Sequence, residues 1–238
     1  MKKIVCENYE KMSVLAAEMI SEQLKRKPDT VLGLATGSTP LGMYAELVKR
    51  YEAGTLDFSK ARSFNLDEYY PIKKDHEQSY NYFMNDNLFS KVNLTNTRVP
   101  NGEAADPEKE CAGYDAEIDA AGGIDIQVLG IGLNGHIGFN EPDTAYSLGT
   151  YHVKLTQSTL DANSRFFDDP KEQPDAALTM GFGAIFSAKS ILLLISGKSK
   201  AEVAAKLFDG KIHTDVPASL LNLHPNVTVI LDKDAAGE

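Results

Sequence analysis

The sequence predicts an α/β fold, in which helices cover both faces of a doubly wound, mostly parallel sheet. Short apolar runs of strand length alternate along the chain with segments of helical periodicity. The runs are apolar at consecutive positions, as expected for parallel strands that are buried on both faces. No repeat, low-complexity tract or linker divides the 238 residues, so we expect one domain over residues 1–238.

The expected elements follow in order along the chain. Apolar residues at i, i+3, i+4, i+7 and i+8 from Met12 to Ile20 predict a helix over residues 9–26. Helical spacing returns from Leu41 to Tyr51, and a third helix is expected after Asp106, an N-cap residue that is followed by proline. A fourth helix should follow residues 196–197. Strands are expected near residues 31–35, 63–66, 124–131, 191–195 and 227–231.

Composition argues against several classes of protein. A net charge of −10 and a pI near 5.0 disfavour a nucleic-acid partner, because nucleic-acid binding requires a basic face. No stretch approaches the roughly 18 apolar residues that cross a bilayer, and charged residues follow the first methionine too soon for a signal peptide. Cys6 and Cys111 form neither a disulfide framework nor a zinc motif. We therefore expect a cytoplasmic protein without a membrane partner.

One loop and two cations are candidates for binding a phosphate group at the carboxyl ends of the strands, where ligands of open α/β sheets bind. Residues 36–40 lie between a strand and a helix, and their hydroxyl and N–H groups suit an anion, although a capped turn is the alternative. Arg165 offers a planar fork and Lys200 a point charge near a helix start, with Lys198 as a competitor. Taken separately, each cation is more typical of a surface charge. The loop residues are Thr36, Gly37, Ser38 and Thr39.

Two further segments supply candidate acids and bases. Asp67 and Glu68 follow an apolar strand, where they form either a solvated turn or, if partly desolvated, a base of raised pKa. The segment 130–142 has four glycines in nine residues, which suggests that its backbone closely approaches a ligand. Within it, Glu141 could orient the ring of His136 across a tight loop. A structural glycine loop is the alternative.

Other catalytic motifs are missing from the sequence. The histidines are scattered, no His-x-x-x-His occurs, and no cluster has metal-ligand spacing, so we expect no metal and no cofactor. A Ser–His–Asp hydrolase is poorly supported, because there is no Gly-x-Ser-x-Gly turn.

Four segments carry most of the unusual residues of the chain. They are Leu-Gly-Leu-Ala-Thr-Gly-Ser-Thr-Pro at 32–40, Phe-Asn-Leu-Asp-Glu-Tyr at 64–69, Gly-His-Ile-Gly-Phe-Asn-Glu-Pro at 135–142 and Ala-Asn-Ser-Arg-Phe-Phe at 162–167. Taken together and in this order, they resemble the glucosamine-6-phosphate deaminase family, and the resemblance extends over essentially the whole chain. It is to the short, non-allosteric type, and it implies a Rossmann-like fold. It also implies conversion of glucosamine 6-phosphate to fructose 6-phosphate and ammonia in amino-sugar catabolism, by an isomerase that would also be classed as a hydrolase.

The same resemblance implies roles for single residues. Asp67 matches the base that moves a proton between C2 and C1, His136 the group that opens the pyranose ring, and Glu141 its carboxylate partner. Some members have Asp where this chain has Asn134, and an amide can position the ring but cannot accept a proton as a carboxylate does. The phosphate cradle would consist of the loop from Thr36 to Thr39, Arg165 and Lys200.

Departures from related proteins define the remaining expectations. Allosteric hexameric members have a longer C-terminal tail and basic residues after Asn-Glu-Pro, whereas this chain reads Asp-Thr-Ala-Tyr-Ser-Leu at 143–148. We therefore expect a monomer or small homo-oligomer that N-acetylglucosamine 6-phosphate does not activate. One alternative is a 6-phosphogluconolactonase-type hydrolase, which typically has Asp-Glu-Arg where residues 67–69 read Asp-Glu-Tyr. Another is a non-catalytic sugar-phosphate sensor, which usually adds a helix-turn-helix segment.

Overall fold

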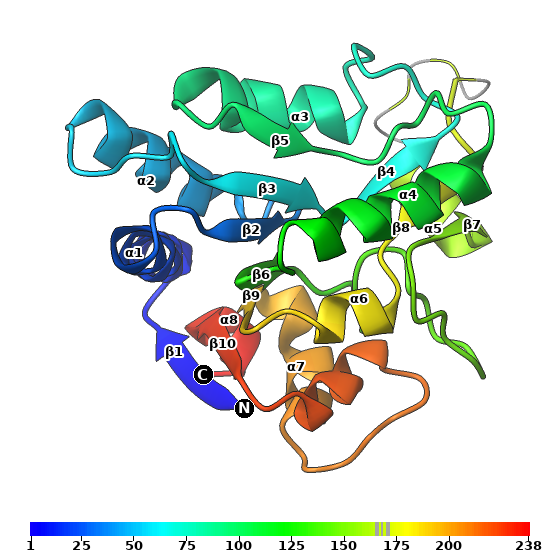
Figure 1. The fold of residues 1–238 in the computed structure, drawn as a ribbon. Coiled ribbons are helices and arrows are strands. Elements are labelled where there is room, and N and C mark those ends of the chain that lie inside the picture. The colour runs from blue at the N-terminus through cyan, green and yellow to red at the C-terminus, as the bar shows by residue number, and fades with distance from the viewer. Residues whose placement is uncertain (165–166, 168, 170–171) are drawn as a thin grey trace.

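The computed structural model describes residues 1–164, 167, 169 and 172–238, and a parallel sheet forms its centre. Within this part of the chain, seven strands follow the order β1-β10-β9-β6-β2-β3-β5, and each neighbouring pair is parallel (Figure 1). The predicted mostly parallel α/β sheet is thereby confirmed. The strands are β1 (Lys2–Cys6), β2 (Val31–Leu34), β3 (Arg62–Asn65), β5 (Asn96–Arg98), β6 (Ile126–Leu129), β9 (Ile191–Ile195) and β10 (Val227–Asp232).

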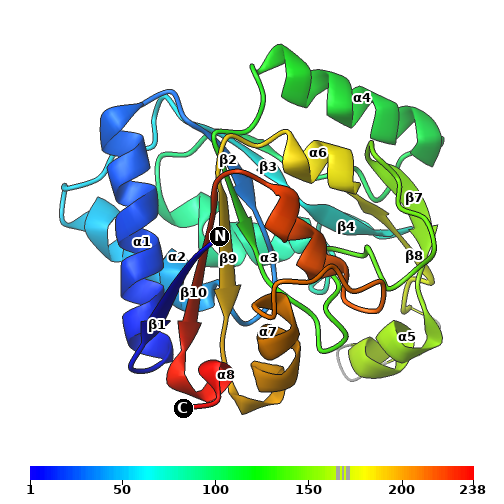
Figure 2. The same ribbon diagram turned by 90° about the horizontal axis from the view of Figure 1, so that it is seen from below.

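Helices pack on both faces of this sheet, as a doubly wound fold requires. Helices α1, α2 and α3 share one apolar core with alternate strand residues such as Leu32 and Leu34. Helices α4, α6, α7 and α8 share the other core with residues such as Leu193 and Leu231 (Figure 2). The helices are α1 (Tyr9–Arg26), α2 (Leu41–Glu52), α3 (Tyr80–Asn87), α4 (Pro107–Ala120), α5 (Gln157–Asn163), α6 (Phe182–Phe186), α7 (Ala201–Leu207) and α8 (Lys233–Ala236).

Local sequence signals explain where several helices begin. The predicted helix over residues 9–26 is α1, and the side chain of Asn8 accepts a hydrogen bond from the Lys11 N–H at its start. The predicted cap at Asp106 is also confirmed, because its carboxylate accepts from the Lys109 N–H ahead of α4. Ser79 caps α3 in the same way.

A second, antiparallel sheet was not predicted from the sequence. Strands β4 (Asp67–Tyr70), β8 (Ala176–Thr179) and β7 (Tyr151–Lys154) form it in the order β4-β8-β7. Only Leu66 separates β3 from β4, so a single apolar run in the sequence is divided between two sheets. The small sheet lies beyond the carboxyl end of β3 (Figure 1), and its position brings Asp67 to that edge of the large sheet.

Candidate active site

The order of the strands brings four loops together at one edge of the large sheet. Strands β9, β6, β2 and β3 are neighbours, and all run in the same direction. The segments that follow them therefore emerge side by side at their carboxyl ends, the usual ligand-binding edge of such a sheet. Apart from Arg165, the residues that the sequence singled out lie in these four segments.

The loop between β2 and α2 has free backbone donors. No N–H group of residues 36–39 has an acceptor among the described residues. The N-cap of α2 is Pro40, which supplies no capping side chain, whereas α1, α3 and α4 each have one. Gly37 adopts a φ of 96°, a conformation that L side chains rarely take. Free N–H groups at an uncapped helix N-terminus form an arrangement that can bind an anion.

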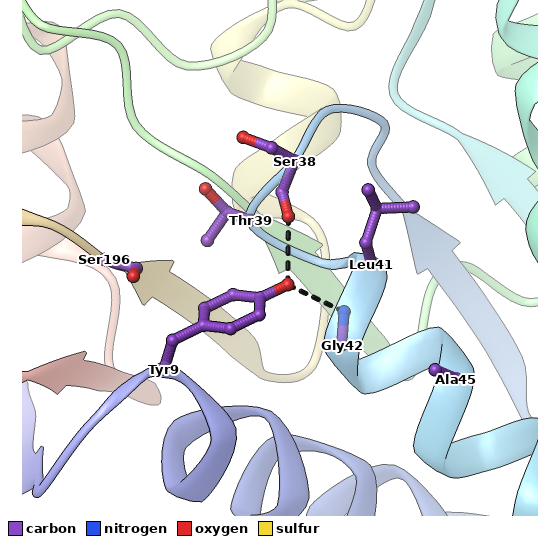
Figure 3. Close-up of a pocket in the computed structure, with 7 residues that line it drawn as sticks. All are labelled: Tyr9, Ser38, Thr39, Leu41, Gly42, Ala45 and Ser196. Atoms are coloured by element: carbon purple, nitrogen blue, oxygen red, sulfur yellow. Dashed lines mark hydrogen bonds between the residues drawn. The ribbon is translucent and has the colours of Figure 1, made fainter.

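A hollow of about 610 Å³ lies behind this loop, between α1 and the end of β9. Tyr9, Ser38, Thr39 and Ser196 line it together with the first turns of α2 (Figure 3). Neither Asp67 nor His136 lines this hollow. It therefore borders the loop on the side of α1 and is not itself the catalytic cavity.

The two candidate lysines differ in their surroundings. Lys200 precedes α7, and its ammonium donates to the carbonyl of Ile131 at 2.7 Å. Ile131 lies within the glycine-rich segment. Partial burial lowers the pKa of Lys200 from its ordinary value. Lys198 is exposed, so the geometry favours Lys200 as the cation of this site. The third predicted cation, Arg165, lies outside the described residues.

Asp67 is a buried carboxyl group at the start of β4. It is 6% exposed, and no hydrogen-bond donor reaches its side chain among the described residues. Burial, with a smaller contribution from the charge of Glu68, raises the pKa of Asp67 to about 8. A methyl group placed on Gly138 would lie 3.3 Å from Asp67 Oδ2, so the glycine-rich segment packs directly against this carboxyl group. The proposed solvated turn at this position is wrong, because β4 is buried in the small sheet.

Glu68 has a different partner set from its neighbour. It is 1% exposed, and its carboxylate accepts from the backbone N–H groups of Tyr69, Tyr80 and Asn81 at 2.8–2.9 Å. Burial raises the pKa of Glu68 to about 7, although these three bonds act in the opposite direction. Glu68 therefore joins β4 to the start of α3. The sequence alone does not indicate this link, because it depends on a helix twelve residues away.

The glycine-rich segment places three polar side chains in contact. Asn134 Nδ2 donates to Glu141 Oε2 at 2.5 Å, and Asn134 Oδ1 lies 2.8 Å from His136 Nδ1. His136 Nδ1 is also 3.3 Å from Glu141 Oε1. The ring lies over Gly132, where a Cβ atom would come within 2.2 Å of it, so glycine is required at that position. The arrangement fixes one face and one nitrogen of the imidazole while leaving the side chain 32% exposed.

Glu141 is held as an anion by several donors. Burial on its own would raise its pKa, but bonds with His136, Thr159 and Asn134 lower the pKa of Glu141 to about 2. The Thr159 hydroxyl donates to Glu141 Oε1 at 2.6 Å from α5. Sequence reasoning did not find Thr159, because nothing in the pattern of α5 shows that its first turn meets the glycine-rich segment.

The described residues form neither a metal site nor a helix that could cross a membrane. No group of three or more His, Cys, Asp or Glu side chains in this part of the chain is arranged to hold a metal ion. None of the helices formed by these residues has the length and hydropathy needed to cross a bilayer.

The parallel sheet, with polar and titratable side chains gathered at the carboxyl ends of its strands, is the architecture of an α/β enzyme. The chain belongs to the family of glucosamine-6-phosphate isomerases and 6-phosphogluconolactonases, whose family model matches residues 7–230. The predicted family membership is thereby confirmed.

Relatives within this family point to its deaminase branch. The glucosamine-6-phosphate deaminase of Thermoanaerobacter pseudethanolicus is 55% identical over 238 residues, covering 99% of this chain and 94% of the relative. That of Clostridioides difficile is 53% identical, covering 100% of this chain and 96% of the relative. These names describe deaminases of the isomerase family, so the expected classification as a hydrolase is not supported.

Solved structures agree with this placement. A monomeric glucosamine-6-phosphate deaminase superimposes with a TM-score of 0.96 at 47% identity, covering 100% of this chain and 99% of that one. A 6-phosphogluconolactonase from Leishmania guyanensis superimposes with a TM-score of 0.77 at 22% identity, covering 99% and 97% of the two chains. The second likeness establishes a shared fold and nothing about activity.

Proposed function

We propose that this protein converts glucosamine 6-phosphate and water into fructose 6-phosphate and ammonia. The observation that carries the proposal is the contact between the buried carboxyl group of Asp67, which no donor among the described residues reaches, and the glycine-rich segment that holds His136 and Glu141. The relatives at 53–55% identity, all named as deaminases for this substrate, support it.

The phosphate group would bind at the N-terminus of α2. The N–H groups of residues 36–39 have no acceptor within the described part of the chain, and together with the dipole of a twelve-residue helix they favour a negative charge there. Lys200 would add a cation from the segment that follows β9, and Arg165 a planar fork. Because the net charge of −10 repels an anionic substrate at long range, these local donors must supply the attraction.

Ring opening would use the contacts of His136. A proton must leave the anomeric hydroxyl of C1 and another must reach the ring oxygen, after which C1 is an aldehyde. An imidazole can perform both transfers, and ionised Glu141 would stabilise its protonated form. Asn134 would hold the ring in place through its amide, without accepting a proton itself.

Isomerisation and deamination would then depend on Asp67. The carboxylate removes the C2 proton, the electron pair forms the C1–C2 double bond, and the aldehyde oxygen gains a proton. Return of the proton to C1 moves the double bond to C2 and nitrogen and gives an imine. Water adds to C2 and ammonia leaves, which completes the ketone. A carboxyl group with a pKa of about 8 is a stronger base than an ordinary aspartate, as abstraction from carbon requires.

Incubation of the purified protein with glucosamine 6-phosphate tests this proposal directly. We expect ammonia and fructose 6-phosphate to appear in equal amounts. Hydrolysis of 6-phosphogluconolactone without ammonia release would instead identify a lactonase. Binding of the amino sugar phosphate without any turnover would identify a sensor.

The oligomeric state of the protein bears on whether its activity is regulated. We infer a monomer whose rate curve is hyperbolic and does not respond to N-acetylglucosamine 6-phosphate. The monomeric deaminase with a TM-score of 0.96 supports this inference. Light scattering tests the monomer, and initial rates with and without N-acetylglucosamine 6-phosphate test the regulation. A sigmoidal rate curve that the acetylated sugar phosphate makes hyperbolic would contradict the inference.

A further inference from the structure

One tyrosine hydroxyl connects the start of α1 to the loop of residues 36–39 and to the first turn of α2. Tyr9 lies in the first turn of α1, and its hydroxyl donates to the carbonyl of Ser38 at 3.0 Å. The same oxygen accepts from the Gly42 N–H at 2.7 Å (Figure 3). The start of α1 is thus tied both to the loop and to the first turn of α2.

The bond to Ser38 determines the direction of a whole peptide group. In a trans peptide the carbonyl and the following N–H point to opposite sides. Because the Ser38 carbonyl points at Tyr9, the Thr39 N–H points away from α1, and it has no acceptor among the described residues. Tyr9 therefore holds the Ser38 carbonyl toward α1, so that the Thr39 N–H on the opposite side remains available as a donor.

The packing of α1 against α2 shows that this contact is specific. A Cβ atom on Gly42 would lie 2.3 Å from Ser13 Oγ and 3.0 Å from the Tyr9 hydroxyl. Only glycine permits the approach, although glycine is less favourable than alanine inside a helix. At the other end of the loop, the buried Tyr44 hydroxyl donates to the Ala35 carbonyl at 2.6 Å. Both ends of the loop are therefore held by tyrosine hydroxyls, and Tyr9 is the one outside the core.

We propose that Tyr9 is a positioning residue for the sugar phosphate, which holds the loop of residues 36–39 in the conformation that presents its N–H groups to the phosphate. The proposal rests on the proposed function, because it assumes that this loop binds the phosphate. Tyr9 does not touch the substrate. It acts through the Ser38–Thr39 peptide group and the entry of α2.

Tyr9→Phe removes the hydroxyl and keeps the ring. A hydrogen bond of this kind contributes about 0.5–1.5 kcal/mol net, so KM should rise roughly 2- to 12-fold. The turnover number should change less than about twofold, because a phosphate remote from C1 and C2 is held alike in the ground and transition states. Inorganic phosphate should bind the variant more weakly by a similar factor, as measured by calorimetry.

Tyr51→Phe is the matched control. Tyr51 lies near the end of α2, and its hydroxyl makes no hydrogen bond within the described part of the chain. We expect its KM and its affinity for inorganic phosphate to equal those of the unaltered protein. The melting temperature of Tyr9→Phe without phosphate serves as a second control, because a merely structural role would lower it without changing phosphate affinity.

The outcomes separate this proposal from the proposed function. Equal phosphate affinity in Tyr9→Phe and the unaltered protein, or no phosphate binding by either, would overturn the role of Tyr9. A fall in turnover with unchanged KM would overturn it as well. If the unaltered protein releases no ammonia but Tyr9→Phe still weakens phosphate binding, the positioning role stands and the proposed reaction fails.

Discussion

Two carboxyl groups lie at the ligand-binding edge of the sheet, and their surroundings differ. No donor reaches Asp67 among the described residues, and burial raises its pKa to about 8. Glu141 is partly buried, but bonds with His136, Thr159 and Asn134 lower its pKa to about 2. Near neutral pH, one group can therefore exchange a proton while the other stays ionised.

The difference indicates how one site can contain both a base and a fixed charge. Desolvation without donors disfavours the charged form, and donors aimed at a carboxylate favour it. Asp67 has the first environment, which suits a group that gains and loses a proton. Glu141 has the second, which suits a group that supports a neighbouring imidazolium.

Asp67→Asn should show the largest effect of any single change in the site. The amide keeps the shape of the side chain but cannot take the C2 proton, and a positioned base contributes on the order of 10²–10⁴-fold to turnover. Ammonia release should fall by at least that factor while the circular dichroism spectrum stays unchanged. Asp86→Asn, at an exposed position on α3, is the matched control and should retain full turnover. Near-normal turnover in Asp67→Asn would remove Asp67 from its assigned role.

The pH dependence of kcat/KM should report the raised pKa of Asp67. The base must be ionised, so kcat/KM should rise about tenfold per pH unit on the acid side and level off near a pKa of about 8. Glu141, with its pKa of about 2, should contribute no limb in this range. Initial rates between pH 5.5 and 9 at roughly constant ionic strength measure the profile. A profile that is flat from pH 6 upward would show that the reaction does not depend on a base with this pKa.

The two carboxyl groups should also change stability in opposite directions with pH. Ionisation of Asp67 opposes folding, so Asp67→Asn should be more stable than the unaltered protein above a pKa of about 8, and this gain should vanish by about pH 4. Ionisation of Glu141 favours folding, so Glu141→Gln should be less stable at neutral pH, with a deficit that disappears toward pH 2. We expect differences on the order of 2 kcal/mol at pH 7.

Urea unfolding at pH 4, 7 and 9 measures these free energies. Asp86→Asn again provides the control, because its carboxylate is exposed and should leave the pH dependence unchanged. If both variants shift the free energy of unfolding in the same direction at pH 7, then ionisation of Asp67 and of Glu141 does not affect folding in opposite ways.

Sequence patterns predicted the five central strands of the large sheet and the loops along its edge, but not the two outer strands, β1 and β5. Continuous apolar runs such as residues 191–195 fixed parallel strands, and glycines and polar residues after those runs marked the ligand-binding edge. The Asp67 segment was harder to interpret, because two carboxylates next to an apolar run are, taken alone, more typical of a solvated turn. Its burial depends on pairing with β8, more than 100 residues away, which no local pattern encodes.

The partners of the site residues were the least predictable part. His136, Asn134 and Glu141 lie within eight residues, so their contact could be expected from a tight loop. Thr159 reaches Glu141 from another element, and threonine in the first turn of a helix is ordinary by itself. Such a hydrogen bond depends on how two segments pack, and a single sequence contains no record of that packing.

Of the changes considered, Thr159→Val should have the smallest effect on turnover and stability, and it tests one of the donors that distinguish Glu141 from Asp67. Valine has nearly the same shape but no hydroxyl, so Glu141 loses one of the donors that favour its charged form. The pKa of Glu141 should rise from about 2 toward its ordinary value, and stability at pH 7 should fall by about 1 kcal/mol. Turnover should fall only a few-fold, because His136 and Asn134 still contact the carboxylate.

Carbon-detected NMR titration of the glutamate carboxyl groups measures this shift directly. Thr95→Val, at an exposed position before β5, should leave the Glu141 titration unchanged. The titration of Asp67 should be the same in both variants, because Thr159 contacts only the other carboxyl group of the pair. If Glu141 still titrates near pH 2 in Thr159→Val, then the His136 and Asn134 contacts alone account for its low pKa, and α5 has no part in holding its charge.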